Sequence, residues 1–89
     1  MEKILVVDDD HNILTVIKMR LEAKDYQVIT ATEIKNAKEA ATQDVFDLAL
    51  VDLKLGDEDG IALMEDLHKL NPEMPIIIFT AYEIGRAHV

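Results

Sequence analysis

The chain has 89 residues, of which 49% are hydrophobic and 4% aromatic, so it suffices for one small domain with an aliphatic core. Its 9 basic and 18 acidic residues give a net charge of −9, which argues against a surface for nucleic acid or anionic lipid. It has no cysteine for a disulfide or thiolate site, no signal peptide and no membrane-length apolar run, so we expect a soluble cytoplasmic α/β unit.

The first half of the chain predicts two strands, each followed by a helix. The run Ile4-Leu5-Val6-Val7 is continuous and β-branched, which is typical of a strand buried on both faces, and Asp8-Asp9-Asp10 follows it. Asp10 or Asn12 can cap the next helix. One apolar stripe is predicted for that helix: Ile13, Leu14, Ile17 and Leu21. A second strand is predicted over 26–30 and a second helix over 33–43. The inward face of this helix is predicted to be Ile34, Ala37, Ala40 and Ala41.

The second half repeats the alternation. A third apolar strand is predicted over 46–51 and ends at Asp52, and the polar stretch 54–60 is predicted to be a loop. A third helix is predicted over 61–70, ended by Asn71-Pro72, and a fourth strand over 75–80. The stripe assigned to this third helix is Ile61, Met64, Leu67 and Leu70. Strands joined by helical crossovers are parallel, so the chain predicts a doubly wound parallel α/β sheet.

Acidic residues follow two of these strands directly. Ligands of open parallel sheets bind at the carboxyl ends of the strands, and Asp8, Asp9, Asp52 and Thr80 lie at the ends of strands one, three and four. One aspartate after a strand is ordinary turn chemistry. Three of them favour a site for a hard cation such as Mg²⁺, and a carboxylate nucleophile can form an aspartyl phosphate.

These residues resemble the receiver domain of two-component response regulators, which has a flavodoxin-like, CheY-like fold. The resemblance runs from Lys3 to about Tyr82. The matching segments are Ile4 to Asp10, Asp47 to Asp52, Asp59-Gly60, and Pro75 to Ala81.

The resemblance implies a role for each matching residue. Asp52 resembles the phosphoacceptor, and Thr80 resembles the hydroxyl that turns toward the phosphoryl group. Asp8 and Asp9 resemble the acidic pair that holds Mg²⁺ together with Asp52 and the backbone carbonyl of Lys54. Gly60 resembles the loop glycine before the third helix, and Ala81 the small residue beside the switch hydroxyl. The family receives its phosphoryl group from a sensor histidine kinase and is not a turnover enzyme.

The chain departs from the family pattern in two places. A proline is usual shortly after the phosphoacceptor, but this chain has Leu55-Gly56-Asp57-Glu58, in which Gly56 can supply the turn. A receiver also continues through a fourth helix, a fifth strand and a fifth helix, so we expect residues 1–82 to be a partial receiver domain. Residues 83–89 resemble a translated sequencing adapter, so we expect a non-native tail.

Other interpretations remain open. A haloacid-dehalogenase-like phosphatase would use Asp8 and Asp10, with Thr80 in its second motif, but Asn12 breaks that pattern and Asp52 is left without a role. A receiver-like interaction module that is never phosphorylated is a further alternative. A calcium loop at 57–60 fails because Leu55 stands where a ligand is needed. The loop pattern most resembles receivers of nitrogen-regulatory (NtrC-type, sigma-54-dependent) activators of transcription, whose output domains this chain lacks.

Overall fold

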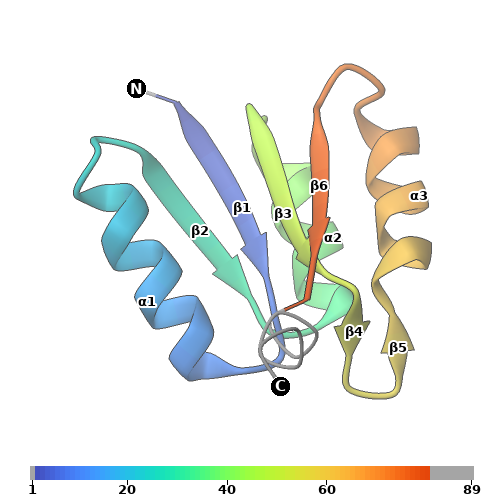
Figure 1. Cartoon of the computed structure of the whole chain (residues 1–89). Helices are drawn as coiled ribbons and strands as arrows, with labels where there is room; N and C mark the ends of the chain where they lie inside the picture. Colours follow the sequence, from blue (N-terminus) through green and yellow to red (C-terminus); the bar gives the residue numbers. More distant parts are fainter. Residues whose placement is uncertain (1, 81–89) are drawn as a thin grey trace.

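The structure is a computed structural model that describes residues 2–80 of the chain. Its centre is a parallel sheet of four strands: β1 (Lys3–Val7), β2 (Gln27–Ala31), β3 (Leu48–Asp52) and β6 (Ile76–Phe79). The strands lie in the order β2-β1-β3-β6 (Figure 1). The chain moves from β1 outward to β2 and then returns to the other side of β1, so the direction of winding reverses between β1 and β3. The carboxyl ends of these two strands therefore flank the topological switch point, where such sheets bind ligands.

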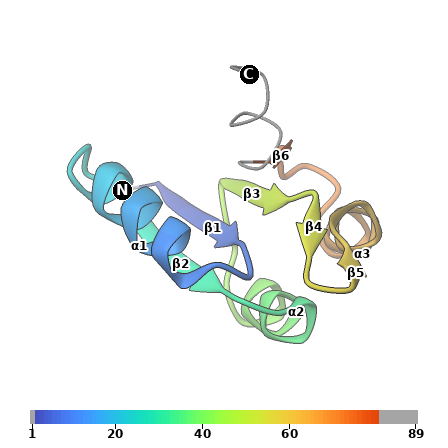
Figure 2. The ribbon, with the colours of Figure 1, turned by 60° about the horizontal axis from the view of Figure 1, so that its bottom comes forward.

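Three helices cover the two faces of the sheet: α1 (His11–Glu22), α2 (Ile34–Gln43) and α3 (Gly60–Leu70). Helix α1 lies on one face, and α2 and α3 lie together on the other (Figure 2). The predicted doubly wound parallel α/β fold is confirmed for residues 2–80. No helix of this part of the chain is long and apolar enough to cross a membrane. The expected domain end at residue 82, Ala81 and the expected tail 83–89 lie outside the described residues.

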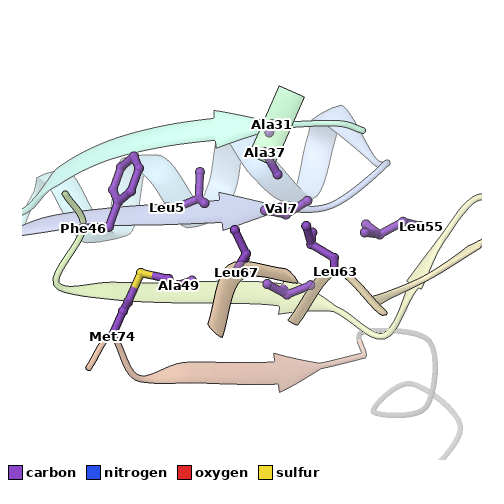
Figure 3. Packing of buried hydrophobic residues seen from close by; sticks show 11 residues of the cluster. Leu5, Val7, Ala31, Ala37, Phe46, Ala49, Leu55, Leu63, Leu67 and Met74 are labelled. Carbon is purple, nitrogen blue, oxygen red and sulfur yellow. The ribbon is translucent and has the colours of Figure 1, made fainter. Parts of the chain in front are cut away.

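Alternate side chains of β1, β2 and β3 enter two separate hydrophobic clusters, one on each face, whereas β6 contributes Ile76 and Ile78 to one of them only. Leu5 and Val7 of β1 join the larger cluster beneath α2 and α3 (Figure 3). Ile4 and Val6 join the smaller cluster beneath α1, around Leu14. Burial on both faces explains why the strands have continuous apolar runs rather than alternating ones. Both layers hold β1 rigidly, so the turn that follows it has a fixed starting point.

Helix α3 presents a different face to the sheet from the predicted one. Leu63 and Leu67 are fully buried and Met64 is half-buried, whereas Ile61 and Leu70 are 44% and 51% exposed, so the predicted stripe is wrong at its two ends and omits Leu63. Apolar residues form two overlapping stripes on this helix, and Gly60 allows its first turn to approach the end of β3 closely. A Cβ at Gly60 would overlap the carbonyl oxygen of Asp52 and lie 3.0 Å from the carbonyl oxygen of Leu53. The helix therefore starts in direct contact with the backbone at the end of β3. The predicted inward face of α2 is confirmed, and that of α1 is confirmed at Leu14, Ile17 and Leu21. Ile13 is only half-buried and belongs to neither cluster.

The stretch predicted as a plain loop contains a short antiparallel hairpin, β4 (Lys54–Leu55) and β5 (Glu58–Asp59). Two residues connect its strands, and the first, Gly56, has a φ of +63°. A glycine with positive φ at this position is typical of two-residue hairpin turns. Leu55 is only 4% exposed and packs into the larger cluster, so a core residue anchors this polar segment.

Helix α1 ends in a tight turn with a residue of left-handed backbone conformation. Asp25 has a φ of 70°. Its N–H donates to the carbonyl of Glu22 at 3.0 Å, and the N–H of Tyr26 donates to that of Leu21 at 3.2 Å. These two bonds form a Schellman motif, whose left-handed position is usually glycine. Tyr26 then packs with Leu21 beneath α1, which fixes the start of β2.

Candidate functional site

Three carboxylates meet at the switch point between β1 and β3. Asp8 and Asp9 follow β1 directly, and Asp52 is the last residue of β3. One oxygen from each of them lies within 4.8 Å of the others. The pairing of Val7 with Val51 sets this convergence, because it brings the two strand ends level. The structure thus brings together the three acidic residues that the sequence predicted to share a site.

Asp8 is the most buried member of the group, with no exposed surface. Its backbone N–H donates to the carbonyl of Ala31 at 3.1 Å, and its Oδ1 accepts from the N–H of Asp10 at 2.8 Å. Its Oδ2 has no hydrogen-bond partner among residues 2–80. Burial raises the pKa of Asp8 to about 6, the bond from Asp10 opposes this, and the charges of Asp52 and Asp9 add to the rise.

Asp9 is exposed, yet the hairpin holds its side chain. The N–H of Gly56 donates to Oδ2 of Asp9 at 3.0 Å, although 47 positions separate the two residues. No sequence pattern indicates this contact, because it depends on the turn geometry of the hairpin. Asp10 serves the helix instead, since its Oδ1 accepts from the N–H groups of Asn12 and Ile13, at 2.8 and 3.4 Å. The prediction that Asp10 caps α1 is confirmed.

Asp52 lies half-buried between β3 and the hairpin. Its Oδ1 accepts from the N–H of Lys54 at 3.3 Å. The ligand role of the Lys54 carbonyl oxygen stays a prediction. Thr80 follows β6 directly and is half-buried, and the preceding Phe79 pairs with Asp52 in the sheet. Thr80 therefore lies beside Asp52 at the same edge of the sheet, as predicted.

A cavity of about 490 Å³ opens beside this group. Its apolar part is Leu55. The other residues that line it are Asp9, His11, Thr32, Glu33, Gly56, Asp57 and Glu58. The sequence did not single out Glu33 or Thr32 as residues near the site. They lie here because β2 ends beside β1 and α2 begins directly after it.

The acidic group suits a hard cation. It offers only oxygen donors, and the buried Oδ2 of Asp8 lacks a partner from the described residues. Burial and mutual repulsion raise the pKa of Asp8, and the positive charge of a divalent cation would offset the repulsion. The residues therefore fit a cation that bridges carboxylates.

Comparison with known proteins agrees with this arrangement. The chain is 40% identical over 79 residues to the transcriptional regulatory protein ZraR of Escherichia coli K12. The aligned residues cover 89% of this chain but only 18% of ZraR. It is similar to a response regulator receiver domain protein of Methanospirillum hungatei, with a TM-score of 0.88, 40% identity and coverage of 92% of this chain and 66% of that one.

Two further structures involve the response regulator TrrA. TrrA of Thermotoga maritima in complex with Mg²⁺ and BeF matches at a TM-score of 0.86 and 29% identity, covering 100% of this chain and 77% of that one. The structure of histidine kinase ThkA in complex with TrrA matches at a TM-score of 0.84 and 30% identity, covering 92% of this chain and 71% of that one. The model of the response regulator receiver domain family matches residues 4–87. A match over nearly the whole chain, on a fold with its acidic group at the switch point, shows that the chain belongs to the response regulator receiver domain family.

Proposed function

We propose that Asp52 is the phosphoacceptor of this receiver and that Asp8 and Asp9, with Asp52 and the backbone carbonyl of Lys54, hold Mg²⁺. The convergence of three carboxylates within 4.8 Å, one of them buried with an unpartnered oxygen among residues 2–80, is the observation that carries this proposal. Family membership makes the chain a signalling module rather than a turnover enzyme, and it argues against the phosphatase that would use Asp8 and Asp10.

In the proposed reaction a carboxylate oxygen of Asp52 attacks the phosphorus of a phosphohistidine on a sensor histidine kinase. The new bond joins that oxygen to phosphorus, and the bond between phosphorus and the imidazole nitrogen breaks, leaving the nitrogen with the electron pair. The N–H of Lys54, 3.3 Å from Oδ1 of Asp52, orients the carboxylate. When bound, Mg²⁺ supplies positive charge that offsets the carboxylates and the transferred phosphoryl oxygens. The ThkA–TrrA complex supports the choice of kinase as partner.

The response to phosphorylation would begin at Thr80. This residue directly follows the strand that pairs with Asp52, so we expect its hydroxyl to donate to a new phosphoryl oxygen and its movement to bias a two-state equilibrium. The chain spans 18% of ZraR, so the output lies outside it. We propose transcriptional control by an activator of NtrC type as that output, because the relatives are transcriptional regulators.

The test is phosphorylation by acetyl phosphate in Mg²⁺, followed by intact mass. We expect a gain of one phosphoryl group, lost on treatment with hydroxylamine and absent in Asp52→Asn. Asp10→Asn is the matched control, because it removes a nearby carboxylate while asparagine still caps α1. A mass gain that survives Asp52→Asn would refute the assignment. No gain in the unaltered chain would favour a receiver-like interaction module.

A further inference from the structure

The tip of the β4–β5 hairpin is tied to the acidic site by one bond. The N–H of Gly56 donates to Oδ2 of Asp9 at 3.0 Å. Asp9 is otherwise exposed, and its neighbours in the site are two more carboxylates. An exposed aspartate repelled in this way would turn toward solvent. The bond from Gly56 opposes that rotation, and a bond from an N–H to a charged carboxylate is stronger than one between neutral groups.

The hairpin can hold Asp9 because the hairpin itself is fixed at both ends. Leu55, next to Gly56, is 4% exposed and packs in the larger cluster. At the other end, the N–H of Gly60 donates to the carbonyl of Leu53 at 2.9 Å. Asp59 then accepts from the N–H of Ile61 at 2.9 Å and starts α3. The position of the Gly56 N–H is thus set by the core and by α3, and Asp9 does not determine it.

Glycine is needed at 56 for its backbone conformation and not for lack of space. Its φ of +63° is rarely adopted by other residues, while a Cβ there would meet only Oδ2 of Asp9, at 4.0 Å. A proline would lack the N–H and hold φ near −65°. The chain therefore combines, at one residue, the turn that closes the hairpin and the donor that reaches Asp9.

We propose that the Gly56 N–H is a positioning group, which holds the carboxylate of Asp9 beside Asp8 and Asp52 before a cation binds. This inference rests on the proposed function, since it explains how one carboxylate of the proposed Mg²⁺ site is held in position before the cation binds. One oxygen of Asp9 lies within 4.8 Å of oxygens of Asp8 and Asp52, and the bond from Gly56 restricts the rotation of the side chain before binding. Preorganisation of this kind tightens binding, because less conformational entropy is lost on association.

The decisive variant replaces the N–H of residue 56 by an oxygen atom and leaves every side chain unchanged. Replacing Gly56 by glycolic acid in a chemically synthesised chain changes the amide to an ester, which deletes the N–H and keeps a residue without Cβ. We expect Mg²⁺, titrated calorimetrically without a phosphoryl donor, to bind about tenfold more weakly. The matched control is the ester at residue 57, whose N–H donates no hydrogen bond within residues 2–80. Equal or tighter Mg²⁺ binding by the Gly56 ester would refute the positioning role.

A second measurement needs neither metal nor synthesis. In the metal-free chain, Asp9→Ala should move the Gly56 amide proton upfield and speed its exchange with solvent, whereas Asp10→Asn should leave both unchanged. An unmoved Gly56 resonance in Asp9→Ala would also overturn the inference. The unaltered chain separates the two proposals. If it binds no Mg²⁺, both fail, and if it binds Mg²⁺ only as tightly as the Gly56 ester does, the positioning role alone fails.

Discussion

Replacing Asp8 by asparagine should stabilise the metal-free chain at neutral pH. Asp8 has no exposed surface, and burial with two neighbouring carboxylates raises its pKa from 3.8 to about 6. The folded state thus holds a proton on Asp8 that the unfolded state has already released at about pH 5. Stability falls with rising pH wherever the folded state binds more protons, so ionised Asp8 opposes folding. Asparagine keeps an oxygen that can accept from the N–H of Asp10 and removes the charge.

The size of the effect follows from the two pKa values. A shift from 3.8 to about 6 corresponds to about 3 kcal/mol, at about 1.4 kcal/mol for each pKa unit. This cost is absent below pH 3.8, grows between the two pKa values and is complete above about pH 6. Linkage places about 1.4 kcal/mol of it between about pH 5 and about pH 7.5. Asp8→Asn should have a higher free energy of unfolding than the unaltered chain. The difference between the two should be about 1.4 kcal/mol larger at about pH 7.5 than at about pH 5.

Urea unfolding in EDTA across this pH range measures the difference, with Asp10→Asn as the control for an exposed carboxylate. Saturating Mg²⁺ should return most of the lost stability to the unaltered chain and less of it to Asp8→Asn. Two free-energy curves that stay parallel across the range would refute the reasoning, because they would mean that Asp8 titrates alike in both states.

Three further substitutions test how the surrounding fold holds the site. Gly60→Ala should lower the free energy of unfolding by about 1–3 kcal/mol in urea, since its Cβ would overlap the carbonyl of Asp52; equal stability would show that α3 does not press on β3. Asp25→Gly should raise the free energy of unfolding by up to about 1 kcal/mol, seen as a higher Tm, because Asp25 has a φ of 70°, which glycine adopts without strain. Leu63→Ala, at a fully buried position, should cost about 2–5 kcal/mol in urea, against about 1 kcal/mol or less for Ile61→Ala, which is 44% exposed; equal losses would contradict the observed face of α3.

The sheet and the acidic site were predictable from sequence for the same reason. A strand buried on both faces must be an apolar run, so β1 and β3 are visible in the sequence, and the residue after the run marks the carboxyl end. The convergence of Asp8, Asp9 and Asp52 requires in addition that β1 and β3 are neighbours, which is the strand order that the structure has. These predictions use only the local pattern and the rule that ligands bind at the switch point.

The rest depended on contacts that no local pattern encodes. The segment of α3 has apolar residues on two stripes, and only the packing of the helix against the sheet shows that Leu63 and Leu67 form the buried one. The strands of the hairpin have two residues each, too short to show a period. The bond between Gly56 and Asp9 joins residues that are distant in the sequence, and it depends on the positive φ of Gly56. The bond could therefore be found only from the structure.

The strand order also has a consequence for how the chain folds during synthesis. β1 leaves the ribosome first, but its pairing with β3 joins Ile4 to Leu48, so more than half of the described chain must emerge before the centre of the sheet can close. Non-local pairings of this kind slow folding, because loop closure costs entropy before the contacts form. Asp52 meets Asp8 only at this closure, so the repulsion that Asp52 adds to the acidic group arises late. Early folding of β1, α1 and β2 therefore involves only the repulsion between the neighbouring Asp8 and Asp9.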